Sequence, residues 1–278
     1  MDALVDTEWL ARHLDDGALR IVDGSWHMPQ LKRDARAEFA ACHIPGAVYF
    51  DIDDIAEPES ALPHMWPDAE TFARKVGALG IGNDHHVVIY DTTGVGSAAR
   101  AWWSFRLFGH DRVSVLDGGL PKWLAEGRPV TDTQTEIEPA SFMACRDPAR
   151  VRALDDVRRI VESGDEQVLD ARSRGRFAAQ EPEPRAGLRG GHMPGSRNQP
   201  FLELYDPDTR LMKPRRELKR LFAAAGIAID KPVVTSCGSG VTACNLALAL
   251  HLIGRDDVAV YDGSWTEWGG RSDTPIET

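Results

Sequence analysis

The stretch Val233-Val234-Thr235-Ser236-Cys237-Gly238-Ser239-Gly240-Val241-Thr242-Ala243 joins a short β-branched run to a cysteine loop and then to a helix. Residues 232–235 are typical of a buried strand, and residues 245–253 are apolar with a helical pattern. Strands and helices that alternate in this way indicate a parallel sheet covered by helices. We therefore expect an α/β protein organised around Cys237.

The loop after this strand is suited to holding negative charge. It directs several backbone N–H groups inward, and the following helix adds the positive end of its dipole. A thiolate at its centre would be stabilised, which makes Cys237 a candidate nucleophile. The alternative is a small buried cysteine that only fills space, which is the usual state of a free cysteine.

Composition excludes several classes of protein. The 278 residues are 42% hydrophobic and 27% charged, as in a soluble globular protein. A net charge of −11 disfavours binding to nucleic acid or to an anionic membrane. The four cysteines form neither a disulfide framework nor a CxxC zinc pair, so we expect a reducing compartment, no metal and no cofactor. The acidic N-terminus lacks an apolar leader and no run is long enough to span a membrane, which favours a cytoplasmic protein.

The chain contains a long internal repeat. Five pairs of markers occur in the same order at offsets of 145 to 149 residues: 19–23 and 167–170, 43–47 and 192–196, 87–88 and 233–234, 113–118 and 258–263, Trp123 and Trp268. A period of this length is a domain, not a solenoid unit.

We therefore predict two tandem domains, residues 1–130 and 151–278, joined by a proline-containing linker at 131–150. Each is expected to have a parallel sheet with helices on both faces. The repeat also places Asp91 where the second copy has Cys237. The first domain is thus predicted to be catalytically inactive and the second catalytic.

These features resemble the tandem rhodanese-like sulfurtransferases, and among them the mercaptopyruvate branch. The resemblance covers nearly the whole chain, through the HIPG and HMPG segments, the Asp-Gly turns before a tryptophan, and the inactive first loop. Its sharpest motif is the CGSGVT loop. Thiosulfate sulfurtransferases carry basic residues beside the cysteine, where this chain has Gly238 and Ser239.

The neutral loop has a physical consequence for the substrate. Cationic loop residues would attract the thiosulfate dianion, whereas mercaptopyruvate carries a single carboxylate and a ketone far from its sulfur. Arginine suits that end because its planar fork can bind carboxylate and carbonyl oxygens together. The resemblance places the two substrate arginines at Arg176 and Arg185, although most arginines are simply solvated.

The resemblance also implies a mechanism. Cys237 would take sulfur from 3-mercaptopyruvate as a persulfide, release pyruvate, and pass the sulfur to a thiol, such as that of thioredoxin, or to cyanide. Backbone groups of the loop would hold the persulfide, and a proton relay would protonate the pyruvate enolate. The implied loop residues are Gly238, Gly240, Val241 and Thr242, and the implied relay is Ser239, His43 and Asp34. A histidine in an HxPG segment can equally well serve to fix a turn.

Three other functions are compatible with a cysteine loop. A cysteine phosphatase or arsenate reductase needs an arginine that closes the loop, and residues 238–245 contain none. A non-catalytic module for binding or sulfur delivery would often lack the cysteine. Thiosulfate specificity remains the third alternative, and the ratio of rates with the two donors distinguishes it.

Overall fold

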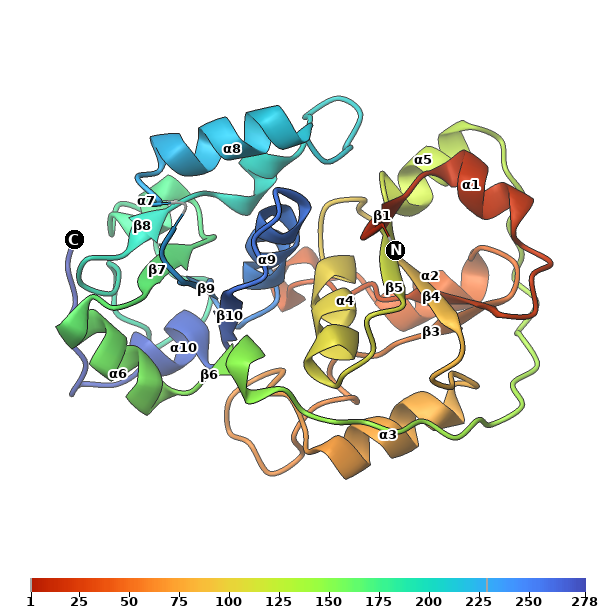
Figure 1. Ribbon diagram of the computed structural model, residues 1–278, viewed down its shortest axis with the longest axis horizontal. Coiled ribbons are helices and arrows are strands. Elements are labelled where there is room, and N and C mark those ends of the chain that lie inside the picture. Colours follow the sequence, from red (N-terminus) through yellow and green to blue (C-terminus); the bar gives the residue numbers. More distant parts are fainter. Residues whose placement is uncertain (1, 229) are drawn as a thin grey trace. The chain divides into compact units, whose positions relative to one another are not determined.

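The computed structural model describes residues 2–228 and 230–278, which form two compact units (Figure 1). Unit 1 contains residues 2–58, 66–146 and 207–212. Unit 2 contains residues 59–65, 147–206, 213–228 and 230–278. Each unit therefore includes a short segment from the other half of the sequence.

Unit 1 is built on a five-stranded parallel sheet of order β1-β5-β4-β2-β3. Its strands are β1 (Leu4–Val5), β2 (Leu19–Asp23), β3 (Ala47–Tyr49), β4 (His86–Tyr90) and β5 (Val113–Leu116). Its helices are α1 (Thr7–Arg12), α2 (Ala35–Ala41), α3 (Ala69–Ala78), α4 (Ala98–Leu107) and α5 (Gly119–Ala125), with a 3-10 turn η1 (Pro29–Leu31).

Unit 2 repeats this plan with the order β6-β10-β9-β7-β8, again all parallel. Its strands are β6 (Val151–Arg152), β7 (Gln167–Asp170), β8 (Arg197–Asn198), β9 (Val233–Ser236) and β10 (Val258–Tyr261). Its helices are α6 (Leu154–Ser163), α7 (Arg174–Phe177), α8 (Arg215–Ala224), α9 (Ala243–Leu252) and α10 (Ser264–Trp268), with 3-10 turns η2 (Pro148–Arg150) and η3 (Phe201–Leu204). The identical strand order confirms the predicted fold class.

The central strands are buried on both faces, which explains their continuous apolar sequence. In β4, Val88 and Tyr90 pack with Leu10 of α1 and Trp123 of α5. Ile89, which alternates with them, lies on the opposite face beside α4. Helices therefore cover both sides of this sheet.

Small details of the two units are duplicated as well. The indole of Trp123 donates to the carbonyl of Pro129, and that of Trp268 donates to the carbonyl of Pro275. In the same way, His43 forms an isolated bridge with Thr131, and His192 forms one with Glu277. The segment after each last helix thus returns along its own unit. Residues 131–146, which belong to the predicted linker, lie on unit 1, where the Ala140 amide donates to Gly77.

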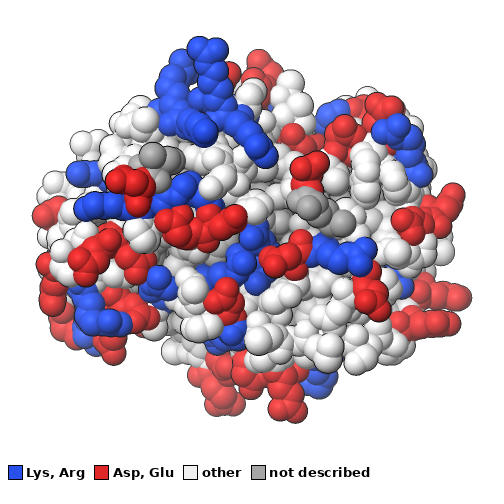
Figure 2. Space-filling view, viewed as in Figure 1, with Lys and Arg blue, Asp and Glu red and all other residues white. Residues whose placement is uncertain are grey.

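Charge is unevenly distributed on unit 2. Lysine and arginine gather over α8, where four exposed cations lie within six residues: Arg215, Arg216, Lys219 and Arg220 (Figure 2). Among the described residues, no helix is long and apolar enough to cross a bilayer.

Candidate active site

The loop between β9 and α9 is a compact, buried turn. Only 2% of the surface of Cys237 and 6% of the surface of Ser239 is accessible to solvent. Gly240 adopts a left-handed φ of +79°, which a side chain would strain, and Gly94 at the matching position of unit 1 has a φ of +74°. The two loops therefore turn at the same glycine, although one contains a thiol and the other a carboxylate.

The loop of unit 1 shows what this conformation binds. One oxygen of Asp91 accepts hydrogen bonds from the amides of Thr93 and Gly94 at 2.8 and 2.7 Å, and from the Thr93 hydroxyl. The other accepts from the amides of Gly96 and Ala98 at 3.1 and 3.0 Å. Five donors thus converge on one buried anion, as in the anion-binding loops at helix N-termini.

Residues at the start of α10 hold the Cys237 loop from behind. Ser264 accepts a hydrogen bond from the Cys237 amide at 3.2 Å, and the Trp265 amide donates to the Cys237 carbonyl at 3.0 Å. Thr266 donates to the Gly238 carbonyl through both its amide, at 2.8 Å, and its hydroxyl, at 2.6 Å. Ser264 adopts a left-handed φ of +49°, an uncommon conformation for serine that these contacts hold in place.

Arg176 and Arg185 both reach this loop. A side chain added at Gly238 would come within 3.2 Å of Nη2 of Arg176 and 3.9 Å of Nη1 of Arg185. Nη2 of Arg185 also donates to the Ser239 hydroxyl at 3.3 Å. The structure thus brings together the predicted nucleophile, the two predicted substrate arginines and Ser239, and the absence of a side chain at Gly238 leaves the guanidinium groups close to the loop.

A chain of buried ion pairs fixes Arg176. Nη2 of Arg176 lies 2.6 Å from one oxygen of Glu183, whose other oxygen lies 2.7 Å from Arg172. Arg172 in turn contacts Asp170 at 2.6 Å and stacks on Trp265. Burial disfavours the charged form of Arg172, but the two carboxylates outweigh burial and raise its pKa. The four alternating charges sum to zero.

The two members of the predicted relay that lie in unit 1 have structural contacts there. The Asp34 carboxylate accepts a hydrogen bond from the Ala37 amide and so caps α2. His43 is 1% exposed, stacks on Phe39 and bonds the Phe39 carbonyl through Nδ1. His192 of unit 2 repeats this arrangement on Phe177.

The remaining cysteines are free thiols. Cys244 is buried in α9 and its sulfur donates to the Gly240 carbonyl at 3.3 Å. Cys42 is half-buried and Cys145 is exposed. No group of His, Cys, Asp and Glu among residues 2–228 and 230–278 could hold a metal ion.

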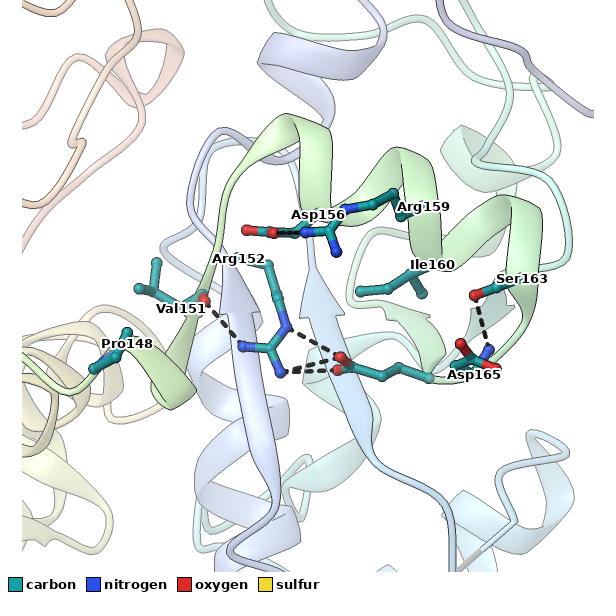
Figure 3. A pocket seen from close by; sticks show the side chains of 9 residues that line it. Pro148, Val151, Arg152, Asp156, Arg159, Ile160, Ser163 and Asp165 are labelled. Carbon is teal, nitrogen blue, oxygen red and sulfur yellow. Dashed lines mark hydrogen bonds and ion pairs between the residues drawn. The ribbon is translucent and has the colours of Figure 1, made fainter.

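A separate groove of about 430 Å³ lies beside α6 and β6, away from the cysteine loop in sequence (Figure 3). Its cations are paired within the groove: Arg152 with both oxygens of Glu166, and Arg159 with Asp156. The groove contains none of the predicted site residues. Its lining comprises Pro148, Val151, Arg152, Asp156, Arg159, Ile160, Ser163, Asp165 and Glu166.

Sequence reasoning missed the residues that support the site. Glu183 stands in the same EPEPR segment as Arg185, so an acidic residue beside a predicted substrate arginine was a usable signal. Thr266 had none, since it follows the loop by 28 residues and no motif marks it.

Comparison with known proteins agrees with this arrangement. The sequence profile of the Rhodanese-like domain matches residues 6–126 and 153–271. The chain is 46% identical to human 3-mercaptopyruvate sulfurtransferase, covering 96% of this chain and 91% of that protein. It is also 44% identical to bovine thiosulfate sulfurtransferase, covering 99% and 94%. Among solved structures, the Escherichia coli 3-mercaptopyruvate sulfotransferase SseA superposes with a TM-score of 0.87 at 39% identity, covering 95% of this chain and 99% of that one.

Proposed function

Because the chain belongs to the rhodanese-like family and carries two tandem copies of its domain, we propose that it is a sulfurtransferase that moves the sulfur of 3-mercaptopyruvate through Cys237. The observation that carries this proposal is the arrangement of one buried cysteine in an anion-binding loop beside two arginines. Sequence similarity alone does not choose the donor, because relatives named for mercaptopyruvate and for thiosulfate have nearly the same identity.

The choice of donor rests on where the positive charge lies. The side chains of Gly238 and Ser239 are neutral, so the loop offers no cation to the sulfonate of thiosulfate. Arg176 and Arg185 instead approach Gly238 from α7 and the segment after it. They can bind the carboxylate and ketone of a substrate whose sulfur points into the loop.

In the first half-reaction, the Cys237 thiolate attacks the sulfur of mercaptopyruvate. The S–S bond forms as the carbon–sulfur bond breaks, and its electron pair leaves with the carbon as the enolate of pyruvate. A proton added at that carbon gives pyruvate. The Ser239 hydroxyl, which accepts a hydrogen bond from Arg185, is the proposed donor or holds the water that donates, with regeneration from solvent.

The persulfide that remains on Cys237 would be stabilised by the loop in the way that unit 1 holds Asp91. Each carboxylate oxygen of Asp91 stands two bonds from Cβ, as does the outer sulfur of a cysteine persulfide. The amides of Ser239, Gly240 and Thr242, which correspond to the donors of unit 1, with the turn shaped by Gly240 and Val241, would surround that sulfur. In the second half-reaction an acceptor thiol, such as that of thioredoxin, or cyanide attacks the outer sulfur and restores the Cys237 thiolate.

The relay through His43 and Asp34 stays a prediction. Asp34 caps a helix and His43 fixes a turn. We therefore assign protonation of the pyruvate enolate to Ser239, and substitution of His43 and Asp34 tests the relay.

Two measurements test the proposed function. Incubation with mercaptopyruvate alone should add one sulfur, about 32 Da, to Cys237 and release one pyruvate, and cyanide should then remove the sulfur as thiocyanate. With cyanide as acceptor, kcat/KM should be higher for mercaptopyruvate than for thiosulfate. A Cys237→Ser variant that still turned over would refute the mechanism, and a preference for thiosulfate would refute the donor.

A further inference from the structure

Thr266 makes a double hydrogen bond to the loop that the mechanism has not used. Its amide and hydroxyl both donate to the carbonyl oxygen of Gly238, at 2.8 and 2.6 Å. The Trp265 amide already connects α10 to the loop by its hydrogen bond to the Cys237 carbonyl. The two hydrogen bonds from Thr266 are therefore additional to those that place the helix beside the loop.

This carbonyl controls the direction of an N–H group in the active loop. The Gly238 carbonyl and the Ser239 amide belong to the same peptide plane, and in a trans peptide the two groups point in opposite directions. Holding the carbonyl toward Thr266 therefore turns the Ser239 N–H away from α10. The matching amide in unit 1, that of Thr93, donates at 2.8 Å to the anion at the centre of its loop.

Unit 1 lacks this support. The position that corresponds to Thr266 is Pro121, which has neither an amide hydrogen nor a hydroxyl. Its neighbouring contact is retained, since the Leu120 amide donates to the Asp91 carbonyl as Trp265 does to Cys237. In unit 1 the Asp91 carboxylate is always present to hold the Thr93 amide. In unit 2 the charge at the centre of the loop changes during the proposed reaction, as Cys237 gains and loses the outer sulfur. The Ser239 amide therefore needs a contact outside the loop to keep its direction.

We propose that Thr266 is a positioning residue, which orients the Ser239 amide toward the sulfur of Cys237 before and during sulfur transfer. The inference rests on the proposed role of Cys237 as nucleophile. An N–H group that already points at the developing charge needs no rearrangement during the reaction. Loss of the hydroxyl should therefore weaken stabilisation of both the thiolate and the persulfide while the fold is retained.

The test compares Thr266→Val, Thr266→Ser and Thr235→Val. Thr266→Val removes only the hydroxyl bond and should lower kcat about tenfold with little change in KM. It should also move the pH midpoint for alkylation of Cys237 by iodoacetamide upward by about half a unit or more. Thr266→Ser keeps the hydroxyl and should restore both values to within about twofold of the parent.

Thr235→Val is the matched control. Thr235 is a fully buried residue of β9 whose hydroxyl lies 3.4 Å from the Ala259 carbonyl, so its replacement reports the general cost of losing a buried threonine hydroxyl. A lower melting temperature for Thr266→Val with an unchanged alkylation midpoint would overturn the proposal, as would an equal shift in Thr235→Val. Alkylation needs no sulfur donor, so this readout stays valid even if mercaptopyruvate is not the substrate.

Discussion

The loops at Asp91 and Cys237 lie at the same place in their units and turn at the same left-handed glycine, but their central residues differ in use. In unit 1 a permanent carboxylate accepts five hydrogen bonds, caps the start of α4 and closes the loop to any other anion. In unit 2 a thiol leaves the equivalent donors for a charge that is bound and released. The comparison indicates that the fold offers an anion-binding loop in each copy. The residue at the centre of the loop decides whether it only stabilises the fold, as with Asp91, or can react, as proposed for Cys237.

A second difference lies beside the loops. Phe39 stacks on His43 in unit 1, and Phe177 stacks on His192 in unit 2. The residue before this phenylalanine is Glu38 in unit 1 and Arg176 in unit 2, so the side-chain charge is reversed. The phenylalanine precedes the stacked histidine by four residues in unit 1 but by fifteen in unit 2. The longer connection carries Glu183 and Arg185. The proposed substrate site of unit 2 therefore differs from unit 1 by one charge reversal and one longer connection.

The largest effect is expected from Cys237→Asp, which gives unit 2 the central residue of unit 1. Turnover should fall by at least about 10⁴-fold, because a carboxylate cannot accept sulfur. The melting temperature should equal or exceed that of Cys237→Ser, because the loop amides can bind the new carboxylate as they bind Asp91. If Cys237→Asp were the less stable of the two, the loop donors would not be arranged as in unit 1.

Arg185→Ala should lower kcat/KM for mercaptopyruvate by about 10² to 10³, the cost of losing a charged hydrogen bond to the substrate carboxylate. The reaction of the preformed persulfide with cyanide should change much less. Arg174→Ala is the matched control, because Arg174 lies on α7 beside Arg176 but is exposed and pairs with Glu203. Equal losses in the two variants, or in the two half-reactions, would remove Arg185 from the donor site.

Asp91→Asn tests the comparison from the side of unit 1. An amide nitrogen in place of one oxygen would face the N–H groups of Gly96 and Ala98, so we expect the free energy of unfolding to fall by about 3 kcal/mol. Urea denaturation followed by fluorescence measures this, since unit 1 contains several buried tryptophans. Alkylation of Cys237 in the folded variant serves as the control and should be unchanged.

The sequence predicts the duplicated fold and the residues of the cysteine loop. It does not predict the residues that hold the loop and Arg176 in place. The two parallel sheets follow from alternating strand and helix patterns that occur twice, and the Asp91 copy is visible because Asp91 aligns with Cys237. The order of the strands in each sheet is not predicted. The contacts of Glu183 and Thr266 depend on the path of a longer connection and on a turn 28 residues after the loop, which no periodicity encodes. The segments that join the opposite unit, residues 59–65 and 207–212, likewise leave no mark in the sequence.

Asp23 and Asp170 end corresponding strands but differ in partners, and this predicts a pH effect. Asp170 pairs with Arg172, whereas burial raises the pKa of Asp23 from 3.8 to about 6, against opposing hydrogen bonds from Ser25 and with the help of nearby Asp91. An acid with a raised pKa in the folded state loses its proton first in the unfolded chain. Stability should therefore fall as pH rises from about 4 to about 6 and stay lower above that. Asp23→Asn should remove this slope and gain up to about 3 kcal/mol at pH 7, measured by denaturation across this pH range. A variant as pH-sensitive as the parent would show that other groups cause the slope.

The smallest effect is expected from His43, which decides between a relay and a turn. His43 and His192 have the same stacked phenylalanine and the same Nδ1 bond, yet only one of them was predicted to move a proton. If both are structural, His43→Asn and His192→Asn should lower the melting temperature by similar amounts and leave kcat of the folded enzyme within about threefold, with an unchanged pH profile. Asp34→Asn should behave likewise, because asparagine also caps helices.

A relay instead requires His43→Asn alone to lower kcat by about 10² or more and to remove one limb of the pH profile. His192 has the same stacking and Nδ1 bond as His43, but it is less buried and its Nε2 also lies 3.7 Å from Glu277. The lost limb of the pH profile is therefore the readout that separates a relay from the loss of a turn.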